Sequence, residues 1–376
     1  MKRENLQKII ALRHRLHMHP ERSMQEKETV AILQQFLREN TTLRIVDRGK
    51  WFYALKEGNT SSERIAFRAD MDALPIMENE TLPYHSQNPG VSHKCGHDGH
   101  SAILCGLALE LESIETAATI YLIFQPGEET GEGGKICSEL IREEAIREVF
   151  AIHNLGGYPE KSVVYRHGLT QPASEGLKMH FAGKTSHASA PEEGNNPASV
   201  IADVIRYADV ILQQNTKGMA LCTVTGIRLG SGDFGISPGE GELYFTLRAE
   251  HEIRMKELEA RILDYARGRC EERGIRLEPS VHDFFPETRN HDNSLQHVLN
   301  AASDQKLKLI EMDRLWRASE DFGWYLKACP GAIVYIGNGE NYPALHTEEY
   351  DFNDRILETA VDLFAAISRS HETHRS

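Results

Sequence analysis

Apolar residues recur in two patterns along the first part of the chain, and these predict helices followed by short strands. Leu and Ile repeat at helical spacing between charged residues, which predicts amphipathic helices over 3–19 and 24–39. Pro20 separates the two helices, because proline removes a helical hydrogen bond and clashes with the preceding turn. Runs rich in β-branched and aromatic residues then predict strands over 44–46, 51–55 and 64–69.

Continuous apolar runs farther along the chain predict strands that are buried on both faces. They lie at 119–124, 148–152 and 332–336, and helices are expected at 101–111 and 354–370. Buried strands separated by helices are typical of a parallel sheet covered on both sides. The sequence therefore predicts the α/β class, with a mainly parallel sheet flanked by helices.

The pattern changes near residue 170, where apolar and polar residues begin to alternate. Half-exposed strands are expected at 177–181, 221–228 and 242–248. Two long helices are expected among them, at 196–214 and 252–272. We therefore expect a discontinuous domain of residues 1–169 and 287–376, interrupted by an inserted, smaller α+β domain of residues 170–286.

Length, charge and cysteine content narrow the class of protein. A chain of 376 residues suits two domains, or one domain with an insertion. The net charge of 42 − 56 = −14 argues against nucleic acid and membrane surfaces as partners, because both require basic patches. The N-terminus has no signal-peptide pattern, no run of 18 apolar residues occurs, and the six cysteines lack paired spacing. We expect a cytoplasmic protein with reduced thiols.

The segment Cys95-Gly96-His97-Asp98-Gly99-His100 concentrates side chains that bind metals. Thiol and imidazole groups are borderline-soft ligands, suited to Zn, Mn, Fe, Co or Ni. In a bent loop, Cys95 and His97 could reach one ion. Two other interpretations stay open at this point, namely a cysteine nucleophile with its base and a group of polar residues at the start of a helix.

Polar residues follow three of the predicted apolar strands, at the ends where a parallel sheet gathers ligand-binding groups. Asp70 and Asp72 follow the strand at 64–69. Glu128 and Glu129 follow the strand at 119–124, and His153 follows the strand at 148–152. His346 lies in a loop after the last strand. The aspartates could instead cap a loop, and the glutamates could form a solvated turn.

Five side chains with ligand atoms come from four separate loops: Cys95, His97, Glu129, His153 and His346. Five ligands fit two metal ions if one of them, such as the Cys95 thiolate, bridges. A paired-metal site activates water and polarises a carbonyl group. Glu128 would then be the general base, and Asp72 would orient His97 by accepting its second N–H.

The inserted domain contributes one further candidate and one misleading motif. His187 lies between small residues in a loop, where it could stabilise an oxyanion or simply be a surface histidine. The segment 230–235 matches the GxGxxG pattern of dinucleotide-binding loops, but Pro238-Gly239 and a strand follow it. No helix begins there, so the pattern lacks the required context.

Five ordered motifs resemble those of the M20 metallopeptidase family, and most closely its amidohydrolase branch of hippurate, N-acetyl-amino-acid, N-acetyldiaminopimelate and auxin-conjugate hydrolases. The resemblance extends from Leu16 to Asn353. The motifs are Arg68-Ala-Asp70-Met-Asp72-Ala-Leu-Pro75, Cys95-Gly-His97-Asp-Gly-His100, Phe124-Gln-Pro-Gly-Glu128-Glu129, Gly183-Lys-Thr-Ser-His187-Ala and Leu345-His346.

The resemblance implies a catalytic α/β domain with two divalent metal ions per subunit and an inserted lid that often carries a dimer contact. Zn or Mn is expected, with Ni or Co as alternatives, and a homodimer through the lid is expected. The metal ligands implied are Cys95, His97, Glu129, His153 and His346. Glu128 is implied as the proton shuttle and Asp72 as the supporting acid.

The lid departs from the pattern of the family in one segment. Relatives usually have Asn before Ile-Pro-Asp, whereas this chain has Gly235 at the amide position and Gly239 at the acid position. Substrate contacts from this segment are therefore expected to differ. Arg248 still stands where relatives place an arginine, and it could hold a substrate carboxylate.

The motifs together predict a metal-dependent amidohydrolase that cleaves N-acyl amino acids or related small amides, with Glu128 as the general base for metal-activated water. Two alternatives are a dipeptidase or aminoacylase of the same family, and a metal-binding and ligand-binding relative that has lost turnover through its altered lid. The sequence leaves the acyl group and the amino acid open.

Overall fold

The computed structural model describes residues 1–59, 63–79, 81–214 and 218–370. The chain forms two compact units. The first comprises Met1–Thr170, Thr288–Leu315 and Glu320–Ser376. The second comprises Gln171–Glu287 and Trp316–Ser319, so a short segment distant in sequence joins it.

An eight-stranded sheet forms the centre of the first unit, in the order β1-β2-β4-β3-β5-β16-β6-β15. The four inner strands β4, β3, β5 and β16 are mutually parallel, whereas β2 and β6 run antiparallel to them. The predicted mainly parallel sheet is confirmed. The strands are β1 (Arg44–Asp47), β2 (Phe52–Lys56), β3 (Arg64–Asp70), β4 (Thr119–Gln125), β5 (Glu148–Leu155), β6 (Val163–Tyr165), β15 (Leu309–Glu311) and β16 (Gly331–Gly337).

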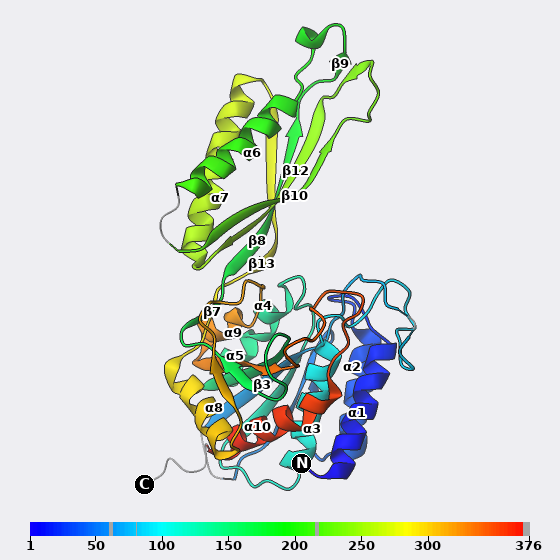
Figure 1. The fold of residues 1–376 in the computed structure, drawn as a ribbon, viewed down its shortest axis with the longest axis vertical. Helices are drawn as coiled ribbons and strands as arrows, with labels where there is room; N and C mark the ends of the chain where they lie inside the picture. The colour runs from blue at the N-terminus through cyan, green and yellow to red at the C-terminus, as the bar shows by residue number, and fades with distance from the viewer. Residues whose placement is uncertain (60–62, 80, 215–217, 371–376) are drawn as a thin grey trace. The chain divides into compact units, whose positions relative to one another are not determined.

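Helices flank this sheet (Figure 1). α1, α3 and α10 pack on one another, and α4, α5 and α9 form a second group. The helices are α1 (Arg3–Met18), α2 (Lys27–Asn40), α3 (His97–Leu111), α4 (Gly133–Cys137), α5 (Glu139–Glu143), α8 (Asp292–Asp304), α9 (Gly323–Ala328) and α10 (Leu357–Ser370), and η2 (Asp354–Ile356) is a 3₁₀ turn. Two short strands, β7 (Leu169–Gln171) and β14 (Thr288–Arg289), pair separately.

Burial explains why the apolar runs became the inner strands. Every residue of β4, β5 and β16 is buried, as expected for strands covered on both faces. β5 extends to Leu155, so His153 lies within the strand instead of following it. α3 begins at His97, four residues before the predicted start at 101.

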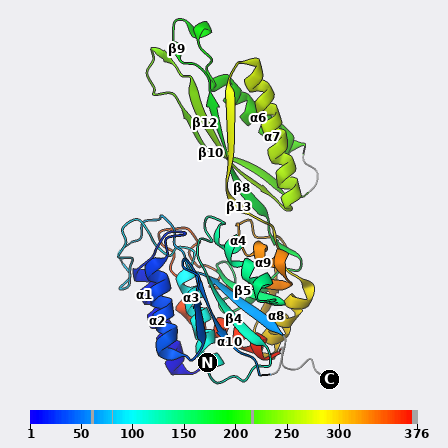
Figure 2. The ribbon, with the colours of Figure 1, turned by 180° about the vertical axis from the view of Figure 1, so that it is seen from behind.

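The second unit is a four-stranded antiparallel sheet in the order β10-β12-β8-β13. α6 and α7 lie side by side on one face of it (Figure 2), which explains the alternating burial along β12. The elements are β8 (Ala173–Ala182), α6 (Ala198–Gln213), β10 (Ala220–Leu229), β12 (Glu240–Ala249), α7 (Glu252–Glu272) and β13 (Arg276–Phe285). β9 (Ser186–His187) pairs with β11 (Ile236–Ser237), and η1 (Pro191–Glu193) is a 3₁₀ turn.

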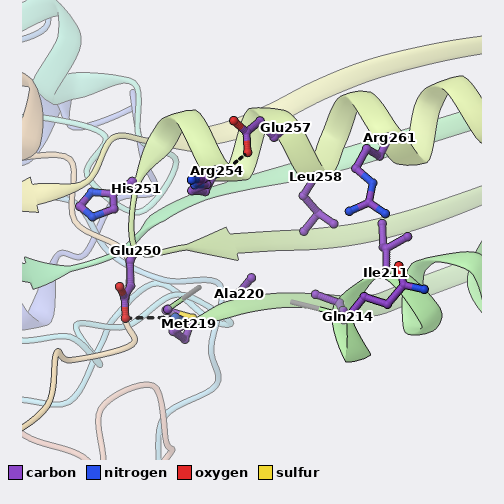
Figure 3. Close-up of a pocket in the computed structure, with 12 residues that line it drawn as sticks. Ile211, Gln214, Met219, Ala220, Glu250, His251, Arg254, Glu257, Leu258 and Arg261 are labelled. Carbon is purple, nitrogen blue, oxygen red and sulfur yellow. Dashed lines mark hydrogen bonds and ion pairs between the residues drawn. The ribbon is translucent and has the colours of Figure 1, made fainter. Parts of the chain in front are cut away.

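A cavity of about 480 Å³ lies in the second unit, between α6, α7 and the start of β10 (Figure 3). Two of its charged side chains have partners in the cavity: Arg254 pairs with Glu257 at 2.6 Å, and Glu250 accepts the Met219 amide at 3.0 Å. None of the predicted site residues is among the described residues that line this cavity.

Among the described residues, no helix is both long and apolar enough to cross a membrane.

Candidate metal centre

The predicted site residues of the first unit emerge at one edge of the central sheet. β3 lies between β4 and β5 and is parallel to both, so the carboxyl ends of all three strands meet. Asp72 follows β3, Glu128 and Glu129 follow β4, and His153 lies near the end of β5. This edge is where open α/β sheets gather functional groups.

A glycine turn brings Cys95 and His97 to the same place. Gly96 has φ 101°, a left-handed conformation that side chains other than glycine rarely adopt. A Cβ atom at Gly96 would lie 2.3 Å from Asn154 Oδ1, so the close approach also requires glycine. His97 is consequently the first residue of α3, and Cys95 precedes the helix.

The five predicted ligands fall into two groups that share one member. The ligand atoms of Cys95, His97 and His153 lie within 4.8 Å of one another, and so do those of Cys95, Glu129 and His346. Cys95 Sγ is 3.5 Å from His153 Nε2. The shared thiol is the arrangement expected when one ligand bridges two ions.

Buried atoms without partners test whether these residues fit a metal. His97 Nε2 and Glu129 Oε1 are buried and have no hydrogen-bond partner among the residues that the structure describes. A buried polar atom without a partner is costly, and a metal ion would satisfy both of these atoms. A thiolate, imidazoles and a carboxylate suit divalent transition metals, and the residues therefore fit such ions.

Protonation in the metal-free centre is set by burial and by crowded carboxylates. Burial, together with the charges of Glu129 and Glu128, raises the pKa of Cys95. Burial opposes charging of His97, but Asp70 and Asp72 outweigh it and raise the pKa of His97 to about 10. Burial raises the pKa of Glu129 to about 8. Cys95, His97 and Glu129 would therefore have to give up protons for a metal to bind.

Asp70, the last residue of β3, and Asp72, two residues later, hold the first turn of α3. Asp72 Oδ1 lies 3.0 Å from His97 Nδ1, which leaves Nε2 free to face a metal. Asp72 Oδ2 accepts the backbone N–H of Glu129 at 3.0 Å. Asp70 instead lies 2.6 Å from His100 Nδ1, so His97 and His100, one helical turn apart, each have their own carboxylate.

Glu128 lies beside the ligand groups in a buried acidic cluster. Carboxylate oxygens of Glu128, Glu320 and Asp321 lie within 4.8 Å of one another, and Glu128 is only 5% exposed. Burial and the charge of Glu320, followed by those of Glu129, Asp321 and Asp70, raise its pKa well above the ordinary value. A carboxyl group with a raised pKa can hold a proton and release it, as a general acid and base must.

Arg68 neutralises much of this cluster. Its guanidinium contacts Asp70 at 2.7 Å, Asp321 at 2.7 Å and Glu320 at 3.1 Å, all buried. α9 begins only at Gly323, and Glu320 and Asp321 turn inward because buried Arg68 requires anionic partners.

Two predicted residues belong to the second unit. His187 is exposed on β9, and its Nδ1 lies 2.7 Å from Ser189 Oγ. Arg248 on β12 is half-buried and donates from Nη1 to Ser319 Oγ at 2.7 Å and to the Arg317 carbonyl at 3.0 Å. Their roles toward a substrate stay predictions.

Sequence reasoning missed a hydrogen-bonded chain behind the ligands. Asp70 connects Arg68 to His100, and His100 Nε2 lies 2.6 Å from Asn154 Oδ1. Asn154 Nδ2 donates to the Tyr350 hydroxyl at 2.7 Å. Arg68, Asp70 and His100 all stand within recognised motifs, and this was the one signal available.

Comparisons with known proteins identify the family. Hippurate hydrolase of Campylobacter jejuni is 30% identical over 365 residues, covering 95% of this chain and 94% of that protein. N-acetyldiaminopimelate deacetylase of Lacticaseibacillus paracasei is 24% identical, covering 93% of this chain and 94% of that protein. A crystal structure from Bacillus subtilis, described as a dinuclear metal-binding peptidase of the M20 family, shares the fold with a TM-score of 0.82. It is 24% identical in sequence, and the match covers 99% of this chain and 100% of that chain. The model of peptidase family M20/M25/M40 matches residues 66–370, and the chain belongs to that family.

Proposed function

We propose that this chain, a metal-dependent amide hydrolase, removes the acyl group from small N-acyl amino acids with Glu128 as its general base. The observation that supports the roles most strongly is the pair of ligand groups sharing Cys95, with buried Glu128 beside them. Cys95, His97, Glu129, His153 and His346 would hold two divalent ions, with Zn or Mn preferred over Ni or Co.

The roles of the protein groups follow from their positions. Two divalent ions in such a site supply an activated water and polarise the scissile carbonyl. Glu128 accepts the proton of the attacking water and delivers it to the departing nitrogen, which must be protonated to leave. Its buried position beside the ligand groups lets one carboxyl group serve both steps. Asp72, which contacts His97 Nδ1, would keep the opposite ring nitrogen, Nε2, available to hold an ion.

The proposed substrate class draws on the relatives. Their names refer to hippurate, N-acetyldiaminopimelate and N-acetylcysteine, the last from Bacillus subtilis at 26% identity. All three are amino acids acylated on nitrogen, so we extend that class to this chain. The acyl group preferred here depends on the segment 234–239, which departs from the family pattern.

The second unit would serve as a lid and as the contact of a homodimer in the cytoplasm. His187 is proposed to stabilise the oxyanion of the tetrahedral intermediate, supported by its exposed imidazole. Arg248 is proposed to hold the substrate carboxylate. Its guanidinium is held by Ser319, which would limit the side-chain entropy lost on binding.

Metal content measured beside a substrate panel tests this function. The panel pairs N-benzoyl and N-acetyl forms of the same amino acids with dipeptides, before and after chelation. Two metals per chain and chelator-sensitive release of acid from the N-acyl compounds are expected. Faster cleavage of the dipeptides would favour a peptidase, and two metals without turnover of any compound would point to a binding protein.

A further inference from the structure

The turn that carries Glu128 and Glu129 requires an unusual backbone conformation. β4 ends at Gln125, and Gly127 takes the left-handed conformation with φ 58°. The Gly127 carbonyl accepts the amides of Glu132 and Gly133 at 3.2 and 3.1 Å, which closes the turn on its far side. The geometry of two adjacent glutamates with different tasks therefore depends on what holds the Gly127 amide.

Glu26, from the connection between α1 and α2, holds that amide. Glu26 Oε1 accepts the N–H of Gly127 at 2.8 Å and that of Met24 at 2.9 Å. Glu26 stands at the N-cap position of α2, yet its carboxylate makes no capping bond to that helix within the described chain. A residue placed to cap its own helix instead reaches 101 positions along the chain.

The location of Glu26 is costly, which argues that the contact matters. The residue is 3% exposed, and Oε2 has no hydrogen-bond partner among the described residues. Burial, with the charge of Asp72, raises the pKa of Glu26 to about 7. Burying a carboxyl group costs free energy unless hydrogen bonds compensate for the lost hydration, and the two bonds of Oε1 are the compensation here.

The same connection also holds the other side of the turn. Ser23 Oγ donates to Asp72 Oδ2 at 2.6 Å, and that oxygen accepts the Glu129 amide. Met24 has φ 64°, and its Sδ would lie 2.6 Å from a Cβ added at Gly127. Glu26 and Ser23 therefore fix Gly127 directly and Glu129 through Asp72.

We propose that Glu26 is a positioning residue for hydrolysis, which aims Glu128 and Glu129 by holding the Gly127 amide. The inference rests on the proposed roles of those two glutamates. Reacting groups misplaced by about 1 Å lose on the order of 100-fold in rate, so loss of this contact should reduce kcat more than substrate affinity.

The test compares Glu26→Ala and Glu26→Gln with a matched control. Glutamine keeps an oxygen that can accept both amides, whereas alanine does not. Glu21→Ala is the control, because Glu21 Oε2 accepts the amide and hydroxyl of Thr29 at 2.8 and 3.0 Å and does not touch the turn. Each variant is assayed for kcat, KM, metal content and melting temperature on the best substrate of the panel.

We expect Glu26→Ala to lower kcat about 10- to 100-fold with KM changed less than about threefold, and Glu26→Gln to recover kcat to within about threefold of the wild type. Glu21→Ala should lower the melting temperature but keep kcat. If Glu26→Ala does not fold, Glu26→Asp provides the second test, because the shorter side chain withdraws the carboxylate from the Gly127 amide, and kcat is expected to fall by about three- to tenfold. A kcat equal to wild type in Glu26→Ala, equal losses in Glu26→Gln and Glu26→Ala, or equal losses in Glu26→Ala and Glu21→Ala would each overturn the inference.

A parallel Glu128→Gln variant separates this inference from the function on which it rests. Full turnover in Glu128→Gln would refute the proposed general base. Full turnover in Glu26→Ala alone, with Glu128→Gln inactive, would refute only the positioning role.

Discussion

At the scale of single residues, the centre depends on carboxylates that never need to touch a substrate. Asp72 makes three bonds, to the His97 ring, the Glu129 amide and the Ser23 hydroxyl. It thereby fixes two proposed ligands from one position. Groups that orient metal ligands typically contribute 10- to 100-fold to metal affinity.

Replacing Asp72 by Asn should therefore weaken metal binding by about 10- to 100-fold, because the amide cannot accept on both sides of the residue. Competition against a chelating indicator measures the affinity. Asp47→Asn is the control, because Asp47 lies on β1, away from the centre. Its carboxylate accepts hydrogen bonds from the Gly49 amide and from the Gln34 side chain. Unchanged affinity in Asp72→Asn would show that His97 does not depend on this carboxylate.

At the scale of elements, α1 is tied to the metal-binding segment through buried charges. His17 on α1 lies 2.7 Å from Asp98 and 2.9 Å from Glu78. Burial opposes the charge of His17, but these carboxylates outweigh it and raise its pKa to about 9. In turn, hydrogen bonds from His17 and Lys94 outweigh burial and lower the pKa of Glu78 to about 2.

This pairing predicts how stability changes with pH. The folded state holds a proton on His17 more tightly than the unfolded state, so its contribution is complete below pH 6.5 and lost as pH rises toward 9. Glu78 contributes above pH 4.5 and loses its contribution as pH falls toward 2. The free energy of unfolding, measured with denaturant, should therefore fall by on the order of 1–3 kcal/mol between pH 6.5 and 9.

His17→Gln should reduce this alkaline loss, because the glutamine carries no proton to lose, whereas His97, whose pKa is raised to about 10, should continue to contribute. His14→Gln is the matched control, since His14 lies one turn earlier and is half-buried against Asp354. Equal pH dependence in His17→Gln and the wild type would mean that another group is responsible.

The start of α3 gives a second prediction for an element. Gly96→Ala adds a left-handed strain and a Cβ within 2.3 Å of Asn154, whose side chain His100 and Tyr350 hold in place. Gly157→Ala is the control, because Gly157 also has positive φ but a Cβ there meets no described atom within 4 Å. We expect Gly96→Ala to lose metal as well as thermal stability, and Gly157→Ala to lose stability alone. Full metal content in Gly96→Ala would contradict the account of this turn.

At the scale of the whole molecule, the two units have separate hydrophobic cores. One core lies around the central sheet, and the other lies between the antiparallel sheet and helices α6 and α7. All five proposed metal ligands belong to the first unit. A ligand stabilises only the folded state that binds it, by an amount that grows with its concentration over its Kd.

Calorimetry should therefore resolve two unfolding transitions, of which chelation lowers only one. At metal concentrations of about 100 Kd the stabilisation is about 2.7 kcal/mol per site. Equal shifts of both transitions on chelation would mean that the metal sites do not belong to the first unit alone.

The sequence could predict the elements better than their connections. Apolar runs identified β4, β5 and β16 because full burial requires them. β13 escaped because most of its side chains are exposed and its pattern is polar. The contact of Arg68 with Asp321 joins residues 253 positions apart, and the contact of Glu26 with Gly127 uses a backbone amide. Neither leaves a pattern along the chain.

The different roles proposed for the adjacent residues Glu128 and Glu129 can be tested by replacing each of them separately. Glu128→Gln and Glu129→Gln are compared for metal content and for turnover of the best N-acyl amino acid. We expect Glu128→Gln to keep two metals per chain and to lose at least about 100-fold in kcat, whereas Glu129→Gln should lose metal. Wild-type turnover in Glu128→Gln would rule out Glu128 as the general base, and loss of its metals would mean that Glu128 is itself a metal ligand.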